Sequence, residues 1–376
     1  MGGLMKLVGA VFVAGTSFAV ATVLQGTGQG TGQPASRDVL EAHLSHGIGP
    51  SPFDSDIWHD ELNATFVVRS RLGATIAELQ QVAGDRQDLS ARLLKLQQDG
   101  FLRREGDRVR ATFPVLVAHE RDTYLELVSE AAATIEEQMR AEWQALLRAL
   151  NERGWAAWSY HFVWSQTMDS GFAWASMMEQ RHVPPLSQVV VWVVYPAHSF
   201  KSGTNYYPDT ELRDQMLAVT WRPGAANTVA RVGGEWQTVL PGALTGKTTA
   251  EGRQRLRALD LIGEDDQVKA PVVKRSDKLY ARLKNLGEHH VQLVAAHLPL
   301  ARLTSLTGAD ANLTFTMAYH DVSWDILRRM VENGVLTVPA ALRDGAGDTV
   351  SMAGVCAIID SHPAFVAELK KVLGIK

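Results

Sequence analysis

Two histidines in similar surroundings have neighbours of the types that acid–base chemistry requires. His161 lies in the run YHFVW and His320 in the run YHDVSW. With Ser165, Asp169 or Asp325 they would supply the base, the nucleophile and the orienting carboxylate of a hydrolase. The sequence contains neither a G-x-S-x-G nor an H-E-x-x-H motif. We therefore expect structural histidines packed among aromatic rings, and keep an exported hydrolase that uses this region as an alternative.

Three further histidines, His289, His290 and His297, cluster in the run GEHHVQLVAAH. If this run is helical, His290 and His297 share a face but stand two turns apart, which is too far to hold one ion easily. The single cysteine, Cys356, lies in an apolar run, so we expect it to be buried as a small hydrophobic residue. One cysteine excludes an intramolecular disulfide and a cysteine-based zinc site. We assign no catalytic, metal-binding or cofactor-binding residue and expect no cofactor.

Residues 242–248, GALTGKT, look like a phosphate-binding Walker loop. Three residues separate the two glycines where four are needed, and Pro241 stands where the first glycine should be. Thr248 and Glu251 instead have the spacing of a capping box. We therefore expect the start of a helix here rather than a nucleotide site.

Residues 155–174 (WAAWSYHFVWSQTMDSGFAW) are unusually rich in aromatic side chains. Near-helical spacing of Trp155, Trp158, Phe162 and Trp174 favours a helix in the core, which is our first interpretation. Tryptophan and tyrosine also dominate protein interfaces and gather at the headgroup level of membranes. The candidate interaction residues in this segment are Trp155, Trp158, Tyr160 and Trp164.

The elements that would position these residues begin with a stretch at 75–113. Thr75 and Glu78 form a capping box at the start of a short helix, and a second amphipathic helix precedes Gly100. Residues 101–102 and 109–113 read as strands on either side of a turn at 105–107. With a first helix expected from 60 to 71, this order resembles the winged helix-turn-helix superfamily over residues 60–113. The resemblance implies an architecture and does not name an activity.

The charges of this winged domain nearly cancel. The predicted wing is basic, and the second helix adds Arg86, Arg92 and Lys95, but five acidic residues lie among them. The whole chain has a formal net charge of -4 and a pI of about 6.3. Strong nucleic-acid binding needs many free cations, so we favour a protein contact over DNA. The basic candidates for an interaction surface are Arg103, Arg104, Arg108 and Arg110.

Residues 1–24 carry a targeting signal, because Lys6 is followed by about 18 residues without a charge. This length suits a membrane anchor over residues 7–24, whereas Ala19-Val20-Ala21 fits the cleavage site of a signal peptide. We favour the anchor, in contact with the lipid bilayer. Positive charge at Lys6 alone favours a cytoplasmic N-terminus and an extracytoplasmic bulk, periplasmic in a bacterium. Small residues four apart would let another membrane helix approach closely: Ala10, Ala14, Gly15 and Ala19.

The chain divides into five parts on these patterns. A Gly/Thr/Gln-rich tether over 25–37 follows the anchor, and the winged domain spans 38–117. A connecting helix over 118–154 leads to a mixed α+β domain over 155–376, with strands expected at 189–195, 216–221, 228–232 and 235–240. Segments 255–270 and 326–336 echo the helix–turn–strand pattern and suggest further winged-helix-like repeats. The fold class expected is α+β.

A non-catalytic interaction role accounts for these features best. We expect a membrane-anchored, mainly extracytoplasmic accessory subunit that docks on other subunits of a larger membrane complex. The first alternative is a membrane-tethered winged-helix regulator that binds DNA, and the second is the exported hydrolase. An extracytoplasmic location would remove DNA as a partner, so the position of the bulk of the chain separates the first two.

Overall fold

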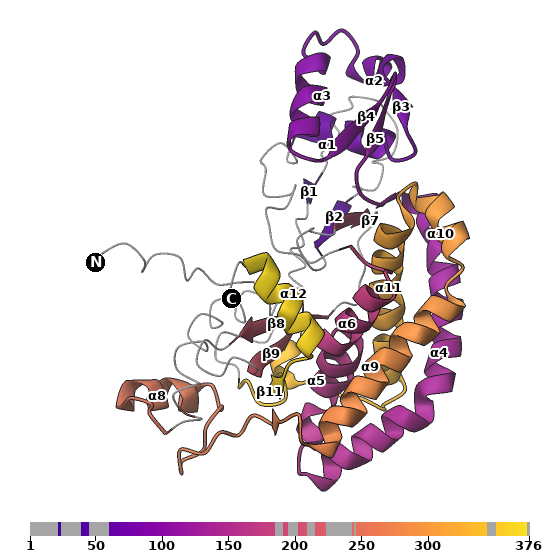
Figure 1. Cartoon of the computed structure of the whole chain (residues 1–376). Helices are drawn as coiled ribbons and strands as arrows, with labels where there is room; N and C mark the ends of the chain where they lie inside the picture. Colours follow the sequence, from indigo (N-terminus) through magenta and orange to yellow (C-terminus); the bar gives the residue numbers. More distant parts are fainter. Residues whose placement is uncertain are drawn as a thin grey trace, which may run out of the picture.

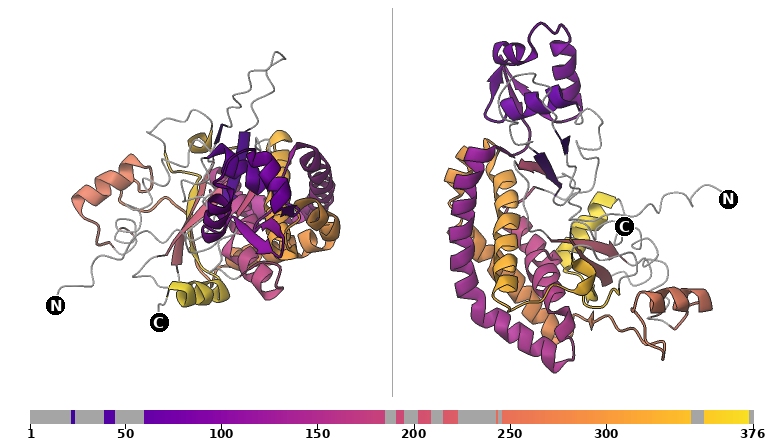
Figure 2. Two further views of the ribbon diagram at one scale, coloured as in Figure 1. Left: turned by 90° about the horizontal axis from the view of Figure 1, so that it is seen from above. Right: turned by 180° about the vertical axis from the view of Figure 1, so that it is seen from behind.

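The chain folds as a mixed α+β protein, shown in Figure 1. The computed structural model describes residues 22–23, 39–44, 60–184, 191–194, 202–208, 215–222, 243, 246–343 and 351–373. Residues 60–117 form a module at one end of the molecule. Long helices run along one side of the remainder, which we call the body, and a sheet lies inside the curve of these helices (Figure 2).

The module combines three short helices with a small antiparallel sheet. The helices are α1 (Glu61–Arg69), α2 (Ile76–Ala83) and α3 (Leu89–Gln98). The strands lie in the order β3 (Ala74–Thr75), β5 (Arg108–Ala111) and β4 (Leu102–Glu105). The helix starts have local causes: the Asp60 carboxylate accepts the amides of Leu62 and Asn63, and Thr75 with Glu78 closes the expected capping box. Apolar side chains from all three helices and the hairpin form a separate core.

Four helices build the long side of the body. The 35-residue helix α4 (Ala118–Glu152) packs against α9 (Lys278–His297) and α11 (Ala311–Glu332), and α10 (Leu300–Thr307) joins the last two. Helix α4 buries a stripe that includes Val128, Ile135, Met139 and Trp143, as the helical spacing predicts. Helix α11 is buried on almost every side from Leu313 to Leu327, so it lies at the centre of the body.

The largest described sheet packs against the aromatic segment. Its order is β10 (Val272–Val273), β11 (Cys356–Asp360), β9 (Gln215–Trp221) and β8 (Gly203–Pro208). The aromatic segment forms η3 (Ala156–Trp158), α5 (Ser159–Val163), a π-helical turn η4 (Trp164–Met168) and α6 (Gly171–Glu179), and the described chain ends in α12 (Pro363–Leu373). Cys356 is buried in β11, as predicted.

A second sheet joins distant parts of the chain. Its order is β1 (Thr22–Val23), β2 (Val39–Leu44), β7 (Val191–Val194) and β6 (Val115–Leu116). Thr22 and Val23, which belong to the expected anchor, therefore pair with Leu40 and Val39. The rest of the expected anchor and the tether lie outside the described residues, as do Ala10, Ala14, Gly15 and Ala19. Within the part of the chain that the structure describes, no helix is both long and apolar enough to cross a bilayer.

Several expectations for the second half of the chain need correction. After α8 (Ala250–Ala258) the expected return strand is only an isolated bridge between Ile262 and Val268. After α11, residues 333–343 form a turn and the short helix η5 (Ala340–Leu342) instead of a strand. Neither of these two segments therefore forms the hairpin of the winged pattern. A helix followed by a glycine stop occurs in many folds, so this pattern alone does not specify a hairpin. Helix α8 is capped by Thr249, one residue after the expected Thr248. The strands expected at 228–232 and 235–240 lie outside the described residues.

Candidate functional site

His161, Ser165 and Asp169 do come together, in a buried polar network beside the π-helical turn. His161 Nδ1 lies 2.8 Å from Thr220 Oγ1, and Ser165 Oγ lies 2.5 Å from the same oxygen. Thr204 Oγ1 donates to Ser165 Oγ at 2.9 Å. Helix α5 and the turn supply one side of this network, and β8 and β9 supply the threonines.

The order of these contacts is not that of a Ser-His-Asp triad. In a triad the histidine contacts both the nucleophile and the carboxylate. Here Thr220 stands between His161 and Ser165, and Asp169 is hydrogen-bonded to Thr204. His161, Ser165, Thr204 and Thr220 are fully buried, and Asp169 is 4% exposed. The network therefore satisfies polar groups inside the core.

Burial sets the protonation of this network. It lowers the pKa of His161 to about 3, against a smaller opposing effect of a hydrogen bond to the Val355 backbone. It raises the pKa of Asp169 to about 7, although hydrogen bonds from Thr204 favour the carboxylate. His161 is thus neutral at pH 7, and Asp169 titrates near that pH.

The cavity beside the network is too small for a substrate. Its volume is about 10 Å³, about enough for one water molecule. Gln166, Tyr206 and His362 are among the residues that line it. The Tyr206 hydroxyl donates to the backbone carbonyls of Ser165 and Asp169, so it holds the π-helical turn in place.

His320 and Asp325 belong to two other networks. His320 is buried in α11 with Nδ1 2.8 Å from the Thr316 carbonyl, and burial lowers its pKa to about 4. Asp325 binds Arg328, Arg329 and the Ser129 hydroxyl at the α4–α11 surface. Burial alone would raise the pKa of Asp325, but hydrogen bonds from the two arginines outweigh it and lower that pKa.

The histidines of α9 point to three different partners. His289 Nδ1 lies 2.9 Å from the Glu142 carboxylate, His290 Nε2 lies 2.9 Å from Ser323 Oγ, and His297 contacts Gln138. Burial lowers the pKa of His290 to about 3. Among the described residues, no group of three or more His, Cys, Asp or Glu side chains is arranged to hold a metal ion.

The aromatic candidates divide between the core and its edge. Tyr160 and Trp164 are 1% and 0% exposed, so they belong to the core and present no surface to a partner. Trp155 and Trp158 are half-buried. Trp155 stacks on Phe162, with 6.1 Å between the ring centroids. The guanidinium carbon of Arg153 lies over the Trp155 ring, 5.4 Å from its centroid. The core interpretation holds for the inner pair.

The basic side chains of the β4–β5 hairpin are bound within the chain. Arg103 pairs with Glu105 at 2.8 Å, and Arg104 Nε donates to the Gly106 carbonyl. Arg108 donates to the Gly73 carbonyl at 3.2 Å. The cations of α3 are paired in the same way, Arg92 with Asp60 and Asp88 and Lys95 with Asp99. Carboxylates therefore offset the charge of Arg92, Lys95 and Arg103, whereas among the described residues Arg104 and Arg108 contact only backbone carbonyls.

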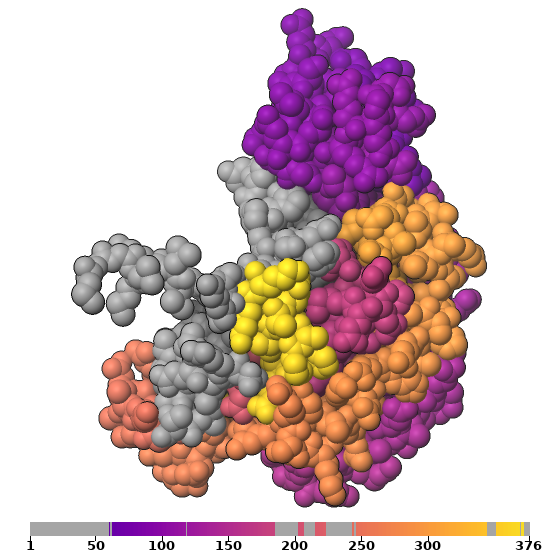
Figure 3. Space-filling view, viewed as in Figure 1, coloured from indigo at the N-terminus to yellow at the C-terminus, as the bar shows by residue number. Residues whose placement is uncertain are grey.

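The fourth arginine of the β4–β5 hairpin, Arg110, joins the module to the body. Arg110 Nη1 donates to the carbonyl of Gly308 at the end of α10, at 3.1 Å. Beside it, Arg71 makes a bidentate pair with Glu120 in the first turn of α4. We call these two contacts the joint. Figure 3 shows the module seated against the end of the body that α10 forms.

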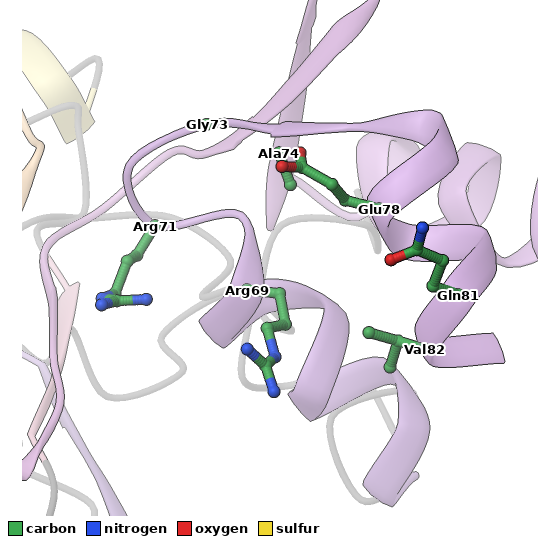
Figure 4. A pocket seen from close by; sticks show the side chains of 7 residues that line it. All are labelled: Arg69, Arg71, Gly73, Ala74, Glu78, Gln81 and Val82. Carbon is green, nitrogen blue, oxygen red and sulfur yellow. The ribbon is translucent and has the colours of Figure 1, made fainter.

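Two open cavities flank the joint. The cavity on the body has a volume of about 490 Å³ and lies between α4 and α11, with Arg121, Asp325 and Arg328 in its walls. The cavity on the module has a volume of about 390 Å³ and lies between the end of α1 and α2. Figure 4 shows its lining: Arg69, Arg71, Gly73, Ala74, Glu78, Gln81 and Val82.

Sequence reasoning missed the partners that come from far along the chain. Thr204 and Thr220 complete the His161 network, and Glu120 and Gly308 complete the joint. Strand β8 carried no clear signal, because its sequence GTNYYP contains glycine and proline at its ends. No local sequence signal marks Glu120, because its contact at the start of α4 is with the backbone amide of Val117, which carries no Ser or Thr side chain.

Comparison with known proteins adds no relative. No protein-family model, no curated protein and no solved structure matches this chain.

Proposed function

We propose that this protein is a non-catalytic accessory subunit of a membrane complex. In this proposal residues 7–24 anchor the chain, residues 25–37 tether it, and the folded part contacts other subunits outside the cytoplasm. The uncharged run after Lys6 and the Gly/Thr/Gln-rich segment that follows support the anchor and the tether. Lys6 supports the orientation through the positive-inside bias.

The pairing of the module's cations is the observation that carries this proposal. Arg92, Lys95, Arg103 and Arg110 each have a carboxylate of the same chain within 3.5 Å. A surface with such balanced charge releases few counterions from a polyanion and suits a protein partner better. We therefore take residues 60–113 as a winged helix that serves as a protein-contact module.

The outer face of α3 supports the same proposal. Leu94 is 56% exposed in the middle of this helix, at the position where a DNA-reading helix would present polar side chains to base edges. The Leu94 side chain offers an apolar contact to a protein partner and no hydrogen bond to a base edge. The burial of His161, Ser165 and His320 favours a non-catalytic role, because a substrate has no access to them.

A pull-down from native membranes tests the proposal. The double variant Ala14→Leu/Gly15→Leu separates membrane helices that approach through small residues, so it should release the protein from its complex. We expect partner recovery to fall at least about tenfold while the protein stays folded and membrane-bound. The readout is quantitative recovery of co-purifying subunits after mild detergent extraction.

The matched control is Val13→Leu/Val20→Leu, which changes the opposite face of the same helix at similar hydrophobicity. This control should recover partners as the unchanged protein does. A mature chain that starts near Thr22 in native membranes would end the anchor part of the proposal. Protection of the folded part from protease added to intact cells would reverse the orientation and return a DNA-binding regulator to first place.

A further inference from the structure

We propose that the cavity between α1 and α2 of the module, lined by Arg69, Arg71 and Gln81, receives a peptide segment with one acidic side chain next to an aliphatic one. This inference rests on the proposed function and names the chemistry of the partner at that surface. The cavity has a volume of about 390 Å³, which lies in the range of about 300–1,000 Å³ that is typical of ligand-binding clefts.

The charge of this cavity is the first step. Arg71 is paired with Glu120. On the Gly73 side of the cavity, Arg108 donates to the Gly73 carbonyl and Arg110 is paired with Glu105. The Arg69 side chain is exposed and has no hydrogen bond or ion pair with any residue that the structure describes. The cavity therefore contains one guanidinium ready to bind a carboxylate, and guanidinium–carboxylate pairs are among the stronger hydrogen-bonded contacts.

Glu78 limits the ligand to a single negative charge. Its carboxylate is held at the start of α2 by the Thr75 amide at 2.6 Å and the Thr75 hydroxyl at 2.9 Å. These two hydrogen bonds lower the pKa of Glu78, so the side chain is ionised at pH 7. A second carboxylate or a row of phosphates would meet this charge in the same cavity.

The remaining wall suits a peptide. Gln81 and Val82 face the cavity from α2, and Arg69 and Arg71 face it from the end of α1 and the loop after it (Figure 4). The Gln81 amide can donate to a peptide carbonyl, and the half-buried Val82 offers apolar surface for an aliphatic side chain.

Fluorescence anisotropy with the full-length protein in mild detergent tests this inference. The probe is a labelled heptapeptide with one glutamate between two leucines, and the matched probe replaces that glutamate by glutamine. We expect the glutamate peptide to bind about tenfold tighter, the effect of one charge-assisted pair. The variant Arg69→Gln should abolish this difference between the two peptides.

The control variant is Arg86→Gln, because Arg86 is the other arginine of the module with no hydrogen-bonding side-chain partner among the described residues and lies outside the cavity. It should change the affinity for the glutamate peptide less than about twofold. Three results would overturn the inference: no saturable binding up to millimolar peptide, equal affinity for the two peptides, or equal loss in both variants. Tighter binding of a 20-base-pair DNA duplex that depends on Arg69 would also overturn it, in favour of a nucleic acid.

These outcomes separate the inference from the function on which it rests. If the glutamate peptide binds through Arg69 but no subunit co-purifies from native membranes, the accessory role fails and the peptide site stands. If subunits co-purify equally well with Arg69→Gln and the peptides bind alike, the accessory role stands and the cavity is not its contact.

Discussion

The carboxylate of Glu120 accepts two hydrogen bonds from the guanidinium of Arg71, with Nε 3.0 Å from Oε2 and Nη2 2.8 Å from Oε1. Arg71 follows the first helix of the module, and Glu120 stands in the first turn of the 35-residue helix α4. The same carboxylate lies 3.4 Å from the amide of Val117 and so caps α4. One buried acid therefore both starts the longest helix and fixes the module against the body.

Arg71→Ala should lower the free energy of unfolding by about 3 kcal/mol, since it leaves the Glu120 carboxylate buried without its cation. Glu120 is only 8% exposed, so water replaces little of the lost interaction. Urea denaturation followed by circular dichroism measures the change. The double variant Arg71→Ala/Glu120→Gln should recover part of the loss, because no charge remains buried.

Arg140→Ala is the matched control for this prediction. Arg140 forms an ion pair with Glu137 on α4, but both side chains are more than half exposed. Such a surface pair contributes between about 0 and 1 kcal/mol, so the control should unfold close to the unchanged protein. Equal losses in Arg71→Ala and Arg140→Ala would show that the joint contributes no special stability.

The sequence contains the local causes of the module and of α4. A capping box at Thr75 and Glu78, leucines at helical spacing and a Glu-Gly-Asp turn each act over a few residues, and the structure has the corresponding helices and hairpin. The apolar stripe of α4 is local in the same sense. For this reason the element order over 60–152 could be read without the structure.

The candidate site could be read only in part. The sequence put His161, Ser165 and Asp169 within nine residues, and they do share one network. Their burial and the threonine between histidine and serine depend on Thr220, 55 residues from Ser165. The joint depends on a contact between Arg110 and Gly308, 198 residues apart. Periodicity and capping act over a few residues, so they hold no information about such pairings.

Asp169→Asn should make the protein progressively more stable than the unchanged chain as the pH rises from about 4 to about 7. Burial raises the pKa of Asp169 to about 7 from an ordinary value of 3.8. Between these values the folded protein keeps a proton that the unfolded chain loses, so this group reduces stability as pH rises. The slope is at most about 1.4 kcal/mol per pH unit, and the difference should level off above pH 7.

Urea denaturation of both proteins at half-unit pH steps measures this difference. The buried His161, His290 and His320 have lowered pKa values and act in the opposite direction, destabilising the fold as the pH falls below 6.5. They are present in both proteins, so their effect cancels in the comparison. A difference that stays constant from pH 4 to pH 7 would mean that Asp169 ionises normally in the folded state.

Gly308→Ala should destabilise the protein by about 2–4 kcal/mol, as the sum of a backbone cost and a packing cost. Gly308 has a φ of +66°, and a Cβ atom there would lie 2.6 Å from the Arg71 carbonyl oxygen and 2.7 Å from the Leu72 side chain.

Gly334→Ala separates the two costs. Gly334 also follows a helix, with a φ of +69°, but nothing lies within 4 Å of a Cβ at that position. We therefore expect only the backbone cost of about 1 kcal/mol there. Thermal unfolding of the two variants side by side gives the comparison, and equal losses would mean that the module moves aside and does not rest on Gly308. A larger loss in Gly308→Ala, with new cleavage by trypsin near Arg71, would show that close contact at this glycine holds the module on the body.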